Sequence, residues 1–326
     1  MTISHEKRNA KRRTLSLMFA VAAGAFVFSL PGAAVAQEKN VLRIGFQKYG
    51  TLPLLKARGT LDKRLAEQGI AVQWREFPAG PQLLEGLNVG SIDFGTVGEA
   101  PPIFAQAANA NLVYVANEPP APAGEAIILP KDSTIKSVAE LKGKKIALNK
   151  GSNVHYLLVK ALEKAGVAYQ DIQTIYLPPA DARAAFERGS VDAWVIWDPF
   201  LAAAEKQIGA RVLVDGKGLV SNHQFYLASR PYAEKYPAIV KILIEELAKT
   251  DEWSAGNLKE VTAILAPQLG LEPAVVELAA SRLTYGIKPI SEAVLVEQQK
   301  IADVFSSLKL IPKKIVIKDA VLPAKH

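Results

Sequence analysis

One segment of the sequence occurs twice, and this repeat limits what the chain can fold into. Residues 90–101 read Gly-Ser-Ile-Asp-Phe-Gly-Thr-Val-Gly-Glu-Ala-Pro, and residues 189–200 read Gly-Ser-Val-Asp-Ala-Trp-Val-Ile-Trp-Asp-Pro-Phe, 99 residues later. Each copy follows a helical apolar pattern and runs through a short apolar strand to an acidic residue and a proline. A helix-turn-strand-turn-helix unit used twice predicts two α/β lobes rather than one compact domain.

The strand of each copy indicates where a ligand would bind. Both strands are continuous apolar runs, which are typical of strands buried on both faces of a parallel sheet. Open α/β sheets bind ligands beside the carboxyl ends of their strands, where the next helices begin. We therefore expect a cleft formed by four strand-to-helix turns, at residues 80–82, 98–100, 150–153 and 197–199.

The first 36 residues have the pattern of a secretory signal peptide. Five basic side chains precede the apolar run 15–30, and small residues follow at 34–36. This run is shorter than the roughly 20 residues of a membrane span. Removing residues 1–36 takes away five of the 39 basic and one of the 32 acidic groups, so the formal net charge falls from +7 to +3. We expect a soluble mature chain that starts near Gln37 and does not bind nucleic acid. Export by the Sec route is favoured, with the twin-arginine route as the alternative, since Arg12-Arg13 fits that signal and Ser16 weakens it.

Apolar periodicity and turn residues predict alternating strands and helices along the mature chain. The strands are expected at 41–46, 70–77, 112–117, 125–130, 144–149, 172–177, 211–214 and 225–229, besides the two repeat strands, and the helices at 52–68, 81–89, 103–110, 137–141, 154–165, 181–188, 199–207, 233–253, 258–269, 272–283 and 291–308. The proline-rich segment 118–124 predicts the crossing into the second lobe, and the strand 225–229 predicts the return. Lobe 1 would comprise residues 37–124 and 226–326, and lobe 2 residues 125–225. We expect the two lobes to close as rigid bodies about segments near Glu125 and Phe225.

The predicted cleft suits an anion with several oxygens. Each turn places unpaired backbone N–H groups and the positive end of a helix dipole at the cleft. Hydrogen bonds to a charged group contribute about 1.5–3 kcal/mol each, so four would give roughly 6–12 kcal/mol, and a micromolar Kd needs about 8 kcal/mol. Backbone donors together with Gln47, Ser152 and Asn153 would therefore hold a monoanion without a buried arginine.

Several candidate residues also have a purely structural interpretation. Asp198 before Pro199 is a good N-cap with proline at the first helical position, and Ser152 and Asp181 are equally suited to capping helices. Trp197 ends a buried strand, so it forms either core or cleft wall.

Other side chains near the predicted cleft are ambiguous. Arg183 is expected at the surface or in an ion pair, and Trp194 in the core. His155 is more often a packed histidine than a catalytic one. Glu99 beside an anion is costly unless it binds a cationic tail or stays protonated.

The chain carries little that would support catalysis. It has no cysteine and four histidines, of which only His155 and His223 lie away from the leader and the last residue. We find no Gly-x-Ser-x-Gly, His-Glu-x-x-His or phosphate-loop motif and no spaced ligand set for a metal. We therefore expect neither an enzyme nor a bound metal or cofactor.

With these motifs in view, the chain resembles the aliphatic sulfonate-binding proteins of bacterial ABC transporters. The resemblance covers nearly all the mature chain and is carried most specifically by residues 76–93, 101–108, 150–152 and 179–186 with 197–199. It implies an α/β periplasmic-binding-protein fold of type II, in which two lobes with mixed, mostly parallel sheets are joined by two crossovers. It also implies a periplasmic monomer that captures an alkanesulfonate and delivers it to a membrane permease driven by a separate ATPase.

In this family the sulfonate lies among the strand-to-helix turns of both lobes. The resemblance thus implies these ligand-binding residues: Gln47, Gly80, Pro81, Gln82, Gly98, Glu99, Gly151, Ser152, Asn153, Asp181, Trp197 and Asp198. Phe46 departs from the family, which has tyrosine there. Binders of taurine, nitrate and pyrimidine precursors share the fold, so taurine, nitrate or an aromatic sulfonate remains an alternative ligand. A secreted enzyme on this fold is a further alternative, although a desulfinase of this kind would use a catalytic cysteine, which the chain lacks.

Overall fold

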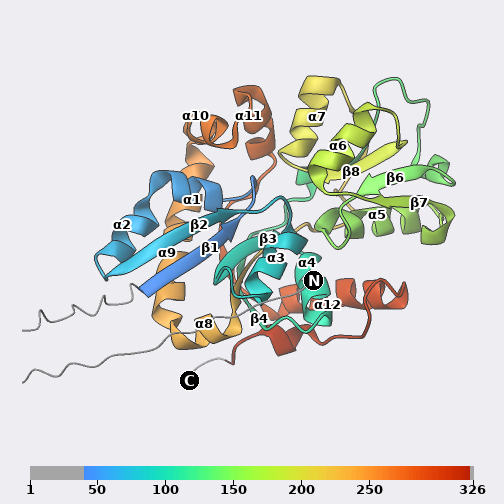
Figure 1. Ribbon diagram of the computed structural model, residues 1–326. Helices are drawn as coiled ribbons and strands as arrows, with labels where there is room; N and C mark the ends of the chain where they lie inside the picture. The colour runs from blue at the N-terminus through green and yellow to red at the C-terminus, as the bar shows by residue number, and fades with distance from the viewer. Residues whose placement is uncertain (1–39, 324–326) are drawn as a thin grey trace, which may run out of the picture. The chain divides into compact units, whose positions relative to one another are not determined.

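The strands of the protein form two separate sheets (Figure 1). The computed structural model describes residues 40–323, so the predicted signal peptide lies outside the described residues. The six-stranded sheet has the order β11-β4-β10-β3-β1-β2, with β1 (Asn40–Phe46), β2 (Ile70–Glu76), β3 (Phe94–Gly98), β4 (Leu112–Asn117), β10 (Gln224–Ser229) and β11 (Lys288–Pro289). The five-stranded sheet has the order β7-β6-β8-β5-β9, with β5 (Glu125–Leu129), β6 (Lys145–Leu148), β7 (Gln173–Tyr176), β8 (Ala193–Trp197) and β9 (Arg211–Asp215).

The two sheets share one topology. In the first, β1 pairs in parallel with β2 and β3, and β10 lies antiparallel between β3 and β4. In the second, β6 pairs in parallel with β7 and β8, and β5 lies antiparallel between β8 and β9. The antiparallel strands β10 and β5 are each the first strand after the chain crosses from the other sheet. They run antiparallel because the arriving chain enters at the carboxyl ends of its new neighbours. The mixed α/β fold is therefore confirmed.

The repeat places β3 and β8 at equivalent central positions. Every residue of both strands is buried, as expected for strands covered on two faces. Trp194 in β8 is fully buried and contacts Phe186, which confirms its assignment to the core. In β3, Gly95 allows Leu83 to lie on the strand, since an added Cβ would come within 2.6 Å of the Leu83 side chain.

The helices follow the predicted order with local corrections. They are α1 (Leu52–Arg58), α2 (Thr60–Ala66), α3 (Gly80–Asn88), α4 (Pro101–Ala107), α5 (Asn153–Lys164), α6 (Pro179–Glu187), α7 (Phe200–Ile208), α8 (Arg230–Lys235), α9 (Pro237–Gly256), α10 (Leu258–Leu269), α11 (Pro273–Ser281) and α12 (Glu292–Ser307). The single helix predicted at 52–68 is wrong, because Gly59 has a left-handed φ of 64° and separates α1 from α2. The helix predicted at 233–253 is also two helices, since Pro237 starts α9 after the non-helical Tyr236. The short helix predicted at 137–141 is a 3-10 helix over Val138–Leu141.

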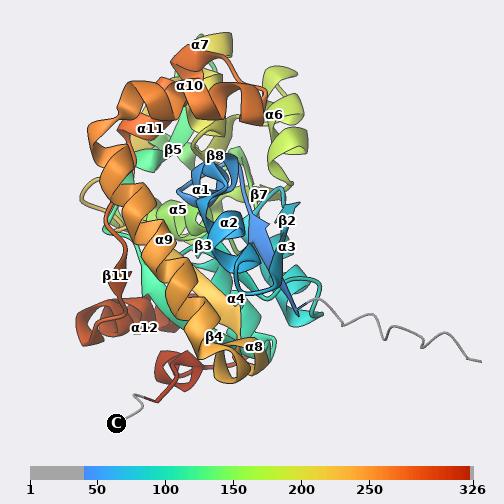
Figure 2. The ribbon, with the colours of Figure 1, turned by 90° about the vertical axis from the view of Figure 1, so that its left-hand side faces the viewer.

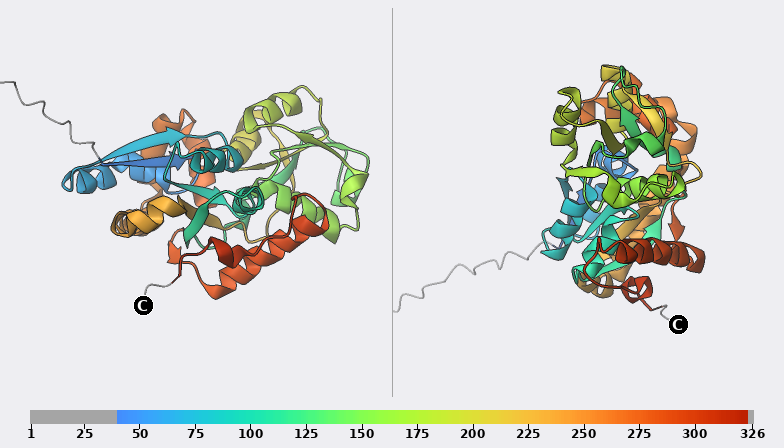
Figure 3. Two further views of the ribbon diagram at one scale, coloured as in Figure 1. Left: turned by 60° about the horizontal axis from the view of Figure 1, so that its bottom comes forward. Right: turned by 90° about the vertical axis from the view of Figure 1, so that its right-hand side faces the viewer.

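The C-terminal helices pack beside elements of both sheets. The α10-α11 hairpin lies beside α1 and α7 (Figures 1 and 2), and Val275 and Ala279 of α11 pack against Ala202 and Ala203 of α7. Helix α12 runs past α4 and reaches α5 (Figure 3), where Phe305 contacts the rings of Phe104, His155 and Tyr156. The predicted lobe boundaries at 124/125 and 225/226 remain a prediction. No helix within residues 40–323 is long and apolar enough to cross a membrane.

Candidate ligand-binding site

The carboxyl ends of strands from both sheets meet at one small cavity. Helix α3 begins after β2, α4 after β3, α5 after β6 and α7 after β8, so four helix starts lie at these strand ends. The cavity is lined by Gln47, Tyr49, Gly80, Gly98, Pro101, Asn153, Trp197 and Gln224. It therefore draws on β3, β10, the segment after β1 and the starts of α3 and α4 on the side of the first sheet, and on α5 and β8 on the side of the second.

Four of the lining side chains have hydrogen-bond donors to spare. The Tyr49 hydroxyl is buried and has no partner. The Gln47 amide donates to the Thr96 carbonyl at 3.1 Å and keeps its second N–H. Neither the Trp197 indole N–H nor the Gln224 side-chain amide bonds to any residue in the described part of the chain. Since a buried donor is rarely left unpaired in folded proteins, the Tyr49 hydroxyl in particular suits a ligand that accepts hydrogen bonds.

Two glycines let the backbone come close to the cavity. An added Cβ at Gly98 would lie 2.8 Å from the Cβ of Asn153, and one at Gly80 would lie 2.7 Å from the Pro101 ring. The contact between Gly98 and Asn153 joins the end of β3 to the start of α5. Any side chain at residue 98 would therefore push the two sheets apart.

A buried network behind the cavity joins the two crossover segments. The Asn153 amide donates to Glu125 and, at 3.1 Å, to the side-chain oxygen of Asn222. Asn222 in turn donates to the Ala121 carbonyl at 2.9 Å. Glu99 accepts from the backbone N–H of His223 at 3.1 Å. Residues at both crossovers are thus tied to the start of α5 and the end of β3.

The carboxyl groups of this network hold their protons. Burial raises the pKa of Glu99 to about 8, against the hydrogen bond from the His223 N–H, and the charge of Glu297 contributes in the same direction as burial. Burial, followed by the charge of Glu99, raises the pKa of Glu125 well above its ordinary value. Both groups are fully buried, and each has one oxygen without a partner. Because they are neutral at pH 7, they do not repel an anion in the adjacent cavity.

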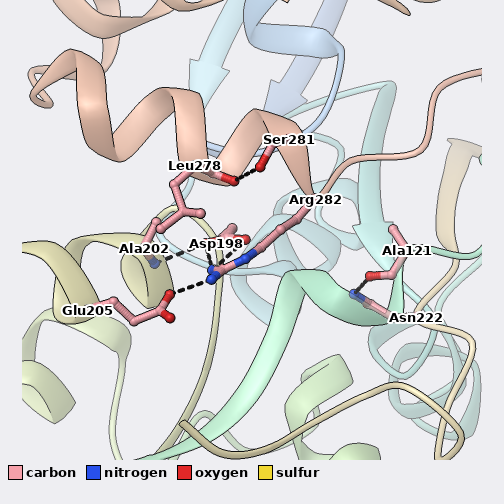
Figure 4. A network of polar contacts seen from close by, with 8 residues as sticks. All are labelled: Ala121, Asp198, Ala202, Glu205, Asn222, Leu278, Ser281 and Arg282. Carbon is pink, nitrogen blue, oxygen red and sulfur yellow. Dashed lines mark hydrogen bonds and ion pairs between the residues drawn. The ribbon is translucent and has the colours of Figure 1, made fainter. Parts of the chain in front are cut away.

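Asp198 belongs to a separate polar cluster (Figure 4). Its carboxylate accepts from the Ala202 N–H in the first turn of α7 at 3.0 Å. The predicted N-cap position of Asp198 is nevertheless wrong, because α7 begins at Phe200 and Pro199 occupies the N-cap. The Arg282 guanidinium lies 3.3 Å from Asp198 and 2.6 Å from Glu205. Burial raises the pKa of Asp198 to about 7, against the opposing effect of Arg282. This ion-paired cluster links the end of α11 to α7 beside the cavity.

Five of the twelve predicted ligand-binding residues line the cavity: Gln47, Gly80, Gly98, Asn153 and Trp197. Glu99 and Asp198 are buried next to it and are engaged by protein partners, as described above. Pro81 is half-buried, and Gln82 is exposed on α3. Asp181 is the third residue of α6 and is exposed, so it does not occupy the N-cap, which is Pro178.

Gly151 and Ser152 direct their donors into the protein. Ser152 occupies the N-cap position of α5, but its hydroxyl donates to the Asn149 carbonyl at 2.7 Å and makes no capping bond. The Gly151 N–H donates to Nδ1 of His155 at 3.2 Å, and Nε2 of His155 lies 2.7 Å from the Tyr169 hydroxyl. Burial lowers the pKa of His155 to about 3, so it is a neutral packed side chain, as the sequence favours. The predicted ligand contacts of Gly151 and Ser152 remain predictions.

Three lining residues were not predicted: Tyr49, Pro101 and Gln224. Pro101 directly follows the predicted turn 98–100, and Tyr49 lies three residues after the predicted strand 41–46. Gln224 reaches the cavity because its pairing with Gly98 in the antiparallel ladder sets it opposite that turn. Within the described residues no group of three or more histidines, aspartates or glutamates is placed to hold a metal ion.

The fold and the cavity together define a class of protein. Two α/β sheets of the same topology, two crossovers and a cavity at the facing strand ends are the features of a type II periplasmic-binding-protein fold. The chain belongs to the NMT1-like family, which matches residues 35–266.

Relatives and solved structures agree with this assignment. A protein of Escherichia coli strain K12, provisionally named an aliphatic sulfonates-binding protein, is 47% identical over 299 residues, which cover 90% of this chain and 93% of that protein. The alkanesulfonate-binding protein SsuA from Xanthomonas axonopodis pv. citri, solved bound to MOPS, is 43% identical with a TM-score of 0.83, covering 89% of this chain and all of that one. The periplasmic aliphatic sulphonate-binding protein SsuA from Escherichia coli is 46% identical with a TM-score of 0.79, covering 88% and 93%. The desulfurization enzyme DSZB, at 16% identity and a TM-score of 0.63, shares the fold.

Proposed function

We propose that the protein is an extracytoplasmic solute-binding receptor that captures aliphatic sulfonates between its two sheets and delivers them to an ABC permease driven by a separate ATPase. The observation that carries this proposal is the cavity with four spare neutral donors at the facing strand ends. The names of the similar proteins supply the class of ligand. The signal-peptide pattern of residues 1–36 supports export to the periplasm, where we expect the mature chain to act as a monomer.

The cavity suits a singly charged anion. No lysine or arginine of the described chain lines it, so a bound ion is held by dipoles and neutral donors. Four hydrogen bonds of about 1.5–3 kcal/mol each give roughly 6–12 kcal/mol, a range that includes the value of about 8 kcal/mol for micromolar affinity. A second charge on the ligand would have to be desolvated without a cation to balance it, so sulfate should bind much more weakly than a sulfonate.

The cavity also supports binding rather than turnover. Its eight lining residues include no serine, cysteine, histidine, lysine, aspartate or glutamate. Nucleophilic catalysis needs such a group beside a base, and the neutral His155 is occupied by Gly151 and Tyr169.

Thermal unfolding of the mature chain from Gln37 tests the proposal. The panel is a series of alkanesulfonates, taurine, nitrate, sulfate and an aromatic sulfonate at equal concentration. A ligand at about 100 times its Kd adds roughly 2.7 kcal/mol to the free energy of unfolding, which gives a measurable rise in Tm. We expect a rise with alkanesulfonates and none with sulfate. A rise with nitrate alone would assign the protein to another ligand class.

The variant Trp197→Phe provides the matched control for the site. It keeps the aromatic wall and removes the spare indole N–H, so it should reduce the sulfonate-induced rise in Tm. Trp253→Phe, which changes a half-buried tryptophan on α9, should leave that rise unchanged. Equal effects of the two substitutions would count against the proposed site.

A further inference from the structure

Two consecutive side chains of α12 hold the segments that form one side of the cavity. Glu297 accepts a hydrogen bond from the Ser221 hydroxyl, and its carboxylate lies 3.5 Å from Nε2 of His223. Gln298 is buried, and its amide donates to the backbone carbonyl of Glu99 at 2.5 Å. One helix therefore holds both the crossover that leads into β10 and the turn that follows β3.

These two segments supply three of the residues that line the cavity. Gly98 directly precedes Glu99, and Pro101 lies two residues after it. Gln224 directly follows His223. The His223 N–H donates to the Glu99 carboxyl at 3.1 Å, so the two segments are tied to each other as well as to α12. Since α12 contributes none of the eight lining residues, its side chains act on the cavity only through the backbone that they hold.

The helix that carries these side chains is packed against elements of both sheets. Its buried face belongs to a core cluster with residues of α3, α4 and β10. Further along, Phe305 contacts the ring of His155 on α5 (Figure 3), the helix that begins at Asn153 in the cavity wall. The Gln298 amide is fixed in turn, because it also donates to the Tyr114 hydroxyl at 3.0 Å. Helix α12 therefore offers a rigid support for the segments beside the cavity.

We propose that Glu297 and Gln298 are positioning residues, which hold the turn after β3 and the start of β10 in the arrangement that binds the ligand. Groups that bind a ligand must stay within about 0.5 Å of their productive positions, and hydrogen bonds behind them provide this precision. Either side chain can be removed without removing an atom that lines the cavity. This inference rests on the proposed function, because it requires a sulfonate to lie in the cavity.

Calorimetric titration of the mature chain at about pH 7 with methane-, butane- and octanesulfonate tests the inference. Gln298→Met keeps the length of the side chain and removes both of its donated hydrogen bonds. We expect the affinity for the sulfonates to fall by roughly fivefold to tenfold, the factor that corresponds to one lost hydrogen bond. A merely structural side chain would lower Tm and leave Kd unchanged, because nearly all the protein is folded well below Tm.

The next residue of the same helix provides the matched control. The Gln299 amide donates to the backbone carbonyl of Ile315 at 3.0 Å, and its oxygen accepts from the Ile317 N–H at 2.9 Å. It thus holds a segment that lines no part of the cavity. Gln299→Met should lower Tm and keep the wild-type Kd.

Two substitutions of Glu297 separate its position from its charge. Nδ1 of His223 lies 2.8 Å from the Glu118 carbonyl, which only accepts, so Nδ1 carries a proton. The amide that Glu297→Gln introduces can therefore accept from the Ser221 hydroxyl and donate to Nε2 of His223, and this conservative variant should keep the wild-type Kd. Glu297→Ala loses both contacts and should bind roughly fivefold more weakly. Loss of a negative charge near an anion would by itself strengthen binding, so weaker binding by Glu297→Ala cannot arise from charge.

The outcomes separate the two levels of the argument. A wild-type Kd for Gln298→Met, or equal losses of affinity for Gln298→Met and Gln299→Met, would overturn the inference and leave the proposed function in place. Glu297→Gln binding as weakly as Glu297→Ala would overturn the positioning role of Glu297. Should Gln298→Met not fold, as judged by its thermal unfolding, the two Glu297 variants decide. If no sulfonate binds the wild-type protein, the proposed function fails and the inference fails with it.

Discussion

Replacing Glu99 by glutamine should flatten the pH dependence of stability. Burial raises the pKa of Glu99 from 4.5 to about 8, so between these values the folded protein keeps a proton that the unfolded chain releases. The free energy of unfolding must therefore fall as pH rises across this interval, and the fall is complete above about pH 8. At about 1.36 kcal/mol for each tenfold change in proton affinity, the wild-type loss amounts to roughly 5 kcal/mol at most.

Glutamine keeps the shape of protonated Glu99 and cannot ionise. Its carbonyl oxygen can still accept from the His223 N–H. Urea unfolding of the mature chain, followed by tryptophan fluorescence between about pH 5 and about pH 9, gives the free energy of unfolding of each variant. We expect E99Q to match the wild type near pH 5 and to exceed it by a few kcal/mol near pH 9.

Other groups also titrate in this interval, so the contribution of Glu99 is read from the difference between the E99Q and wild-type curves. Glu125 contributes in the same direction, because its pKa is raised by burial and by Glu99. Glu85→Gln, on the exposed face of α3, is the control and should follow the wild-type curve. If the E99Q and wild-type curves fall in parallel, Glu99 is not protonated in the folded protein and the reasoning is wrong.

Further predictions concern the cavity and the cluster beside it. Gly98→Ala should weaken sulfonate binding strongly and cost about 1–3 kcal/mol of stability, since its Cβ would lie 2.8 Å from that of Asn153; calorimetry and urea unfolding measure both, and unchanged affinity would refute the close contact. Gln224→Leu should lower sulfonate affinity by roughly tenfold or more in calorimetric titration through the loss of one hydrogen bond to a charged group, and an unaffected Kd would remove Gln224 from the site. Arg282→Met should destabilise the protein by roughly 3 kcal/mol near pH 8, where Asp198 is charged, and by less near pH 5, where it is protonated because burial holds its pKa at about 7; urea unfolding that shows one pH-independent loss would contradict this pairing.

The sequence contains most of the fold because local signals and the global topology agree. The ends of β4 and α10 coincide with the predicted ends, where glycine, proline and asparagine interrupt the apolar pattern. The repeat predicts the equivalence of β3 and β8, since a strand buried on both faces needs the same apolar run and the same turn in either sheet. Gly59 shows the limit of this reasoning, because a single glycine is compatible both with a continuous helix and with the left-handed break that the structure has.

The sequence predicts the candidate site less well than the fold, because the tertiary pairing of distant segments determines which side chains line the cavity. Gln224 lines the cavity only through its register with Gly98, and a shift of one residue would turn it to the opposite face. Ser152 has the right residue type and position for a cap, yet its hydroxyl bonds to Asn149, a choice that depends on the path of the preceding loop. The packing of α11 on α7 joins helices with 64 residues between them, and helical periodicity alone does not indicate the partner of an apolar face.

The same buried network brings the two sheets together at the cavity and keeps Glu99 and Glu125 protonated. Asn153 at the start of α5 contacts Gly98 and Asn222 from the side of the first sheet, while Glu125 begins the first strand of the second. If the two sheets separate to admit a ligand, these contacts break, and water reaches Glu99 and Glu125. Their pKa values then fall toward the ordinary range, because desolvation is the main cause of their rise. The closed form therefore binds protons more tightly than the open one. By linkage through Glu99, an increase in pH from 4.5 to about 8 must progressively favour the open form and weaken the retention of any ligand held between the sheets.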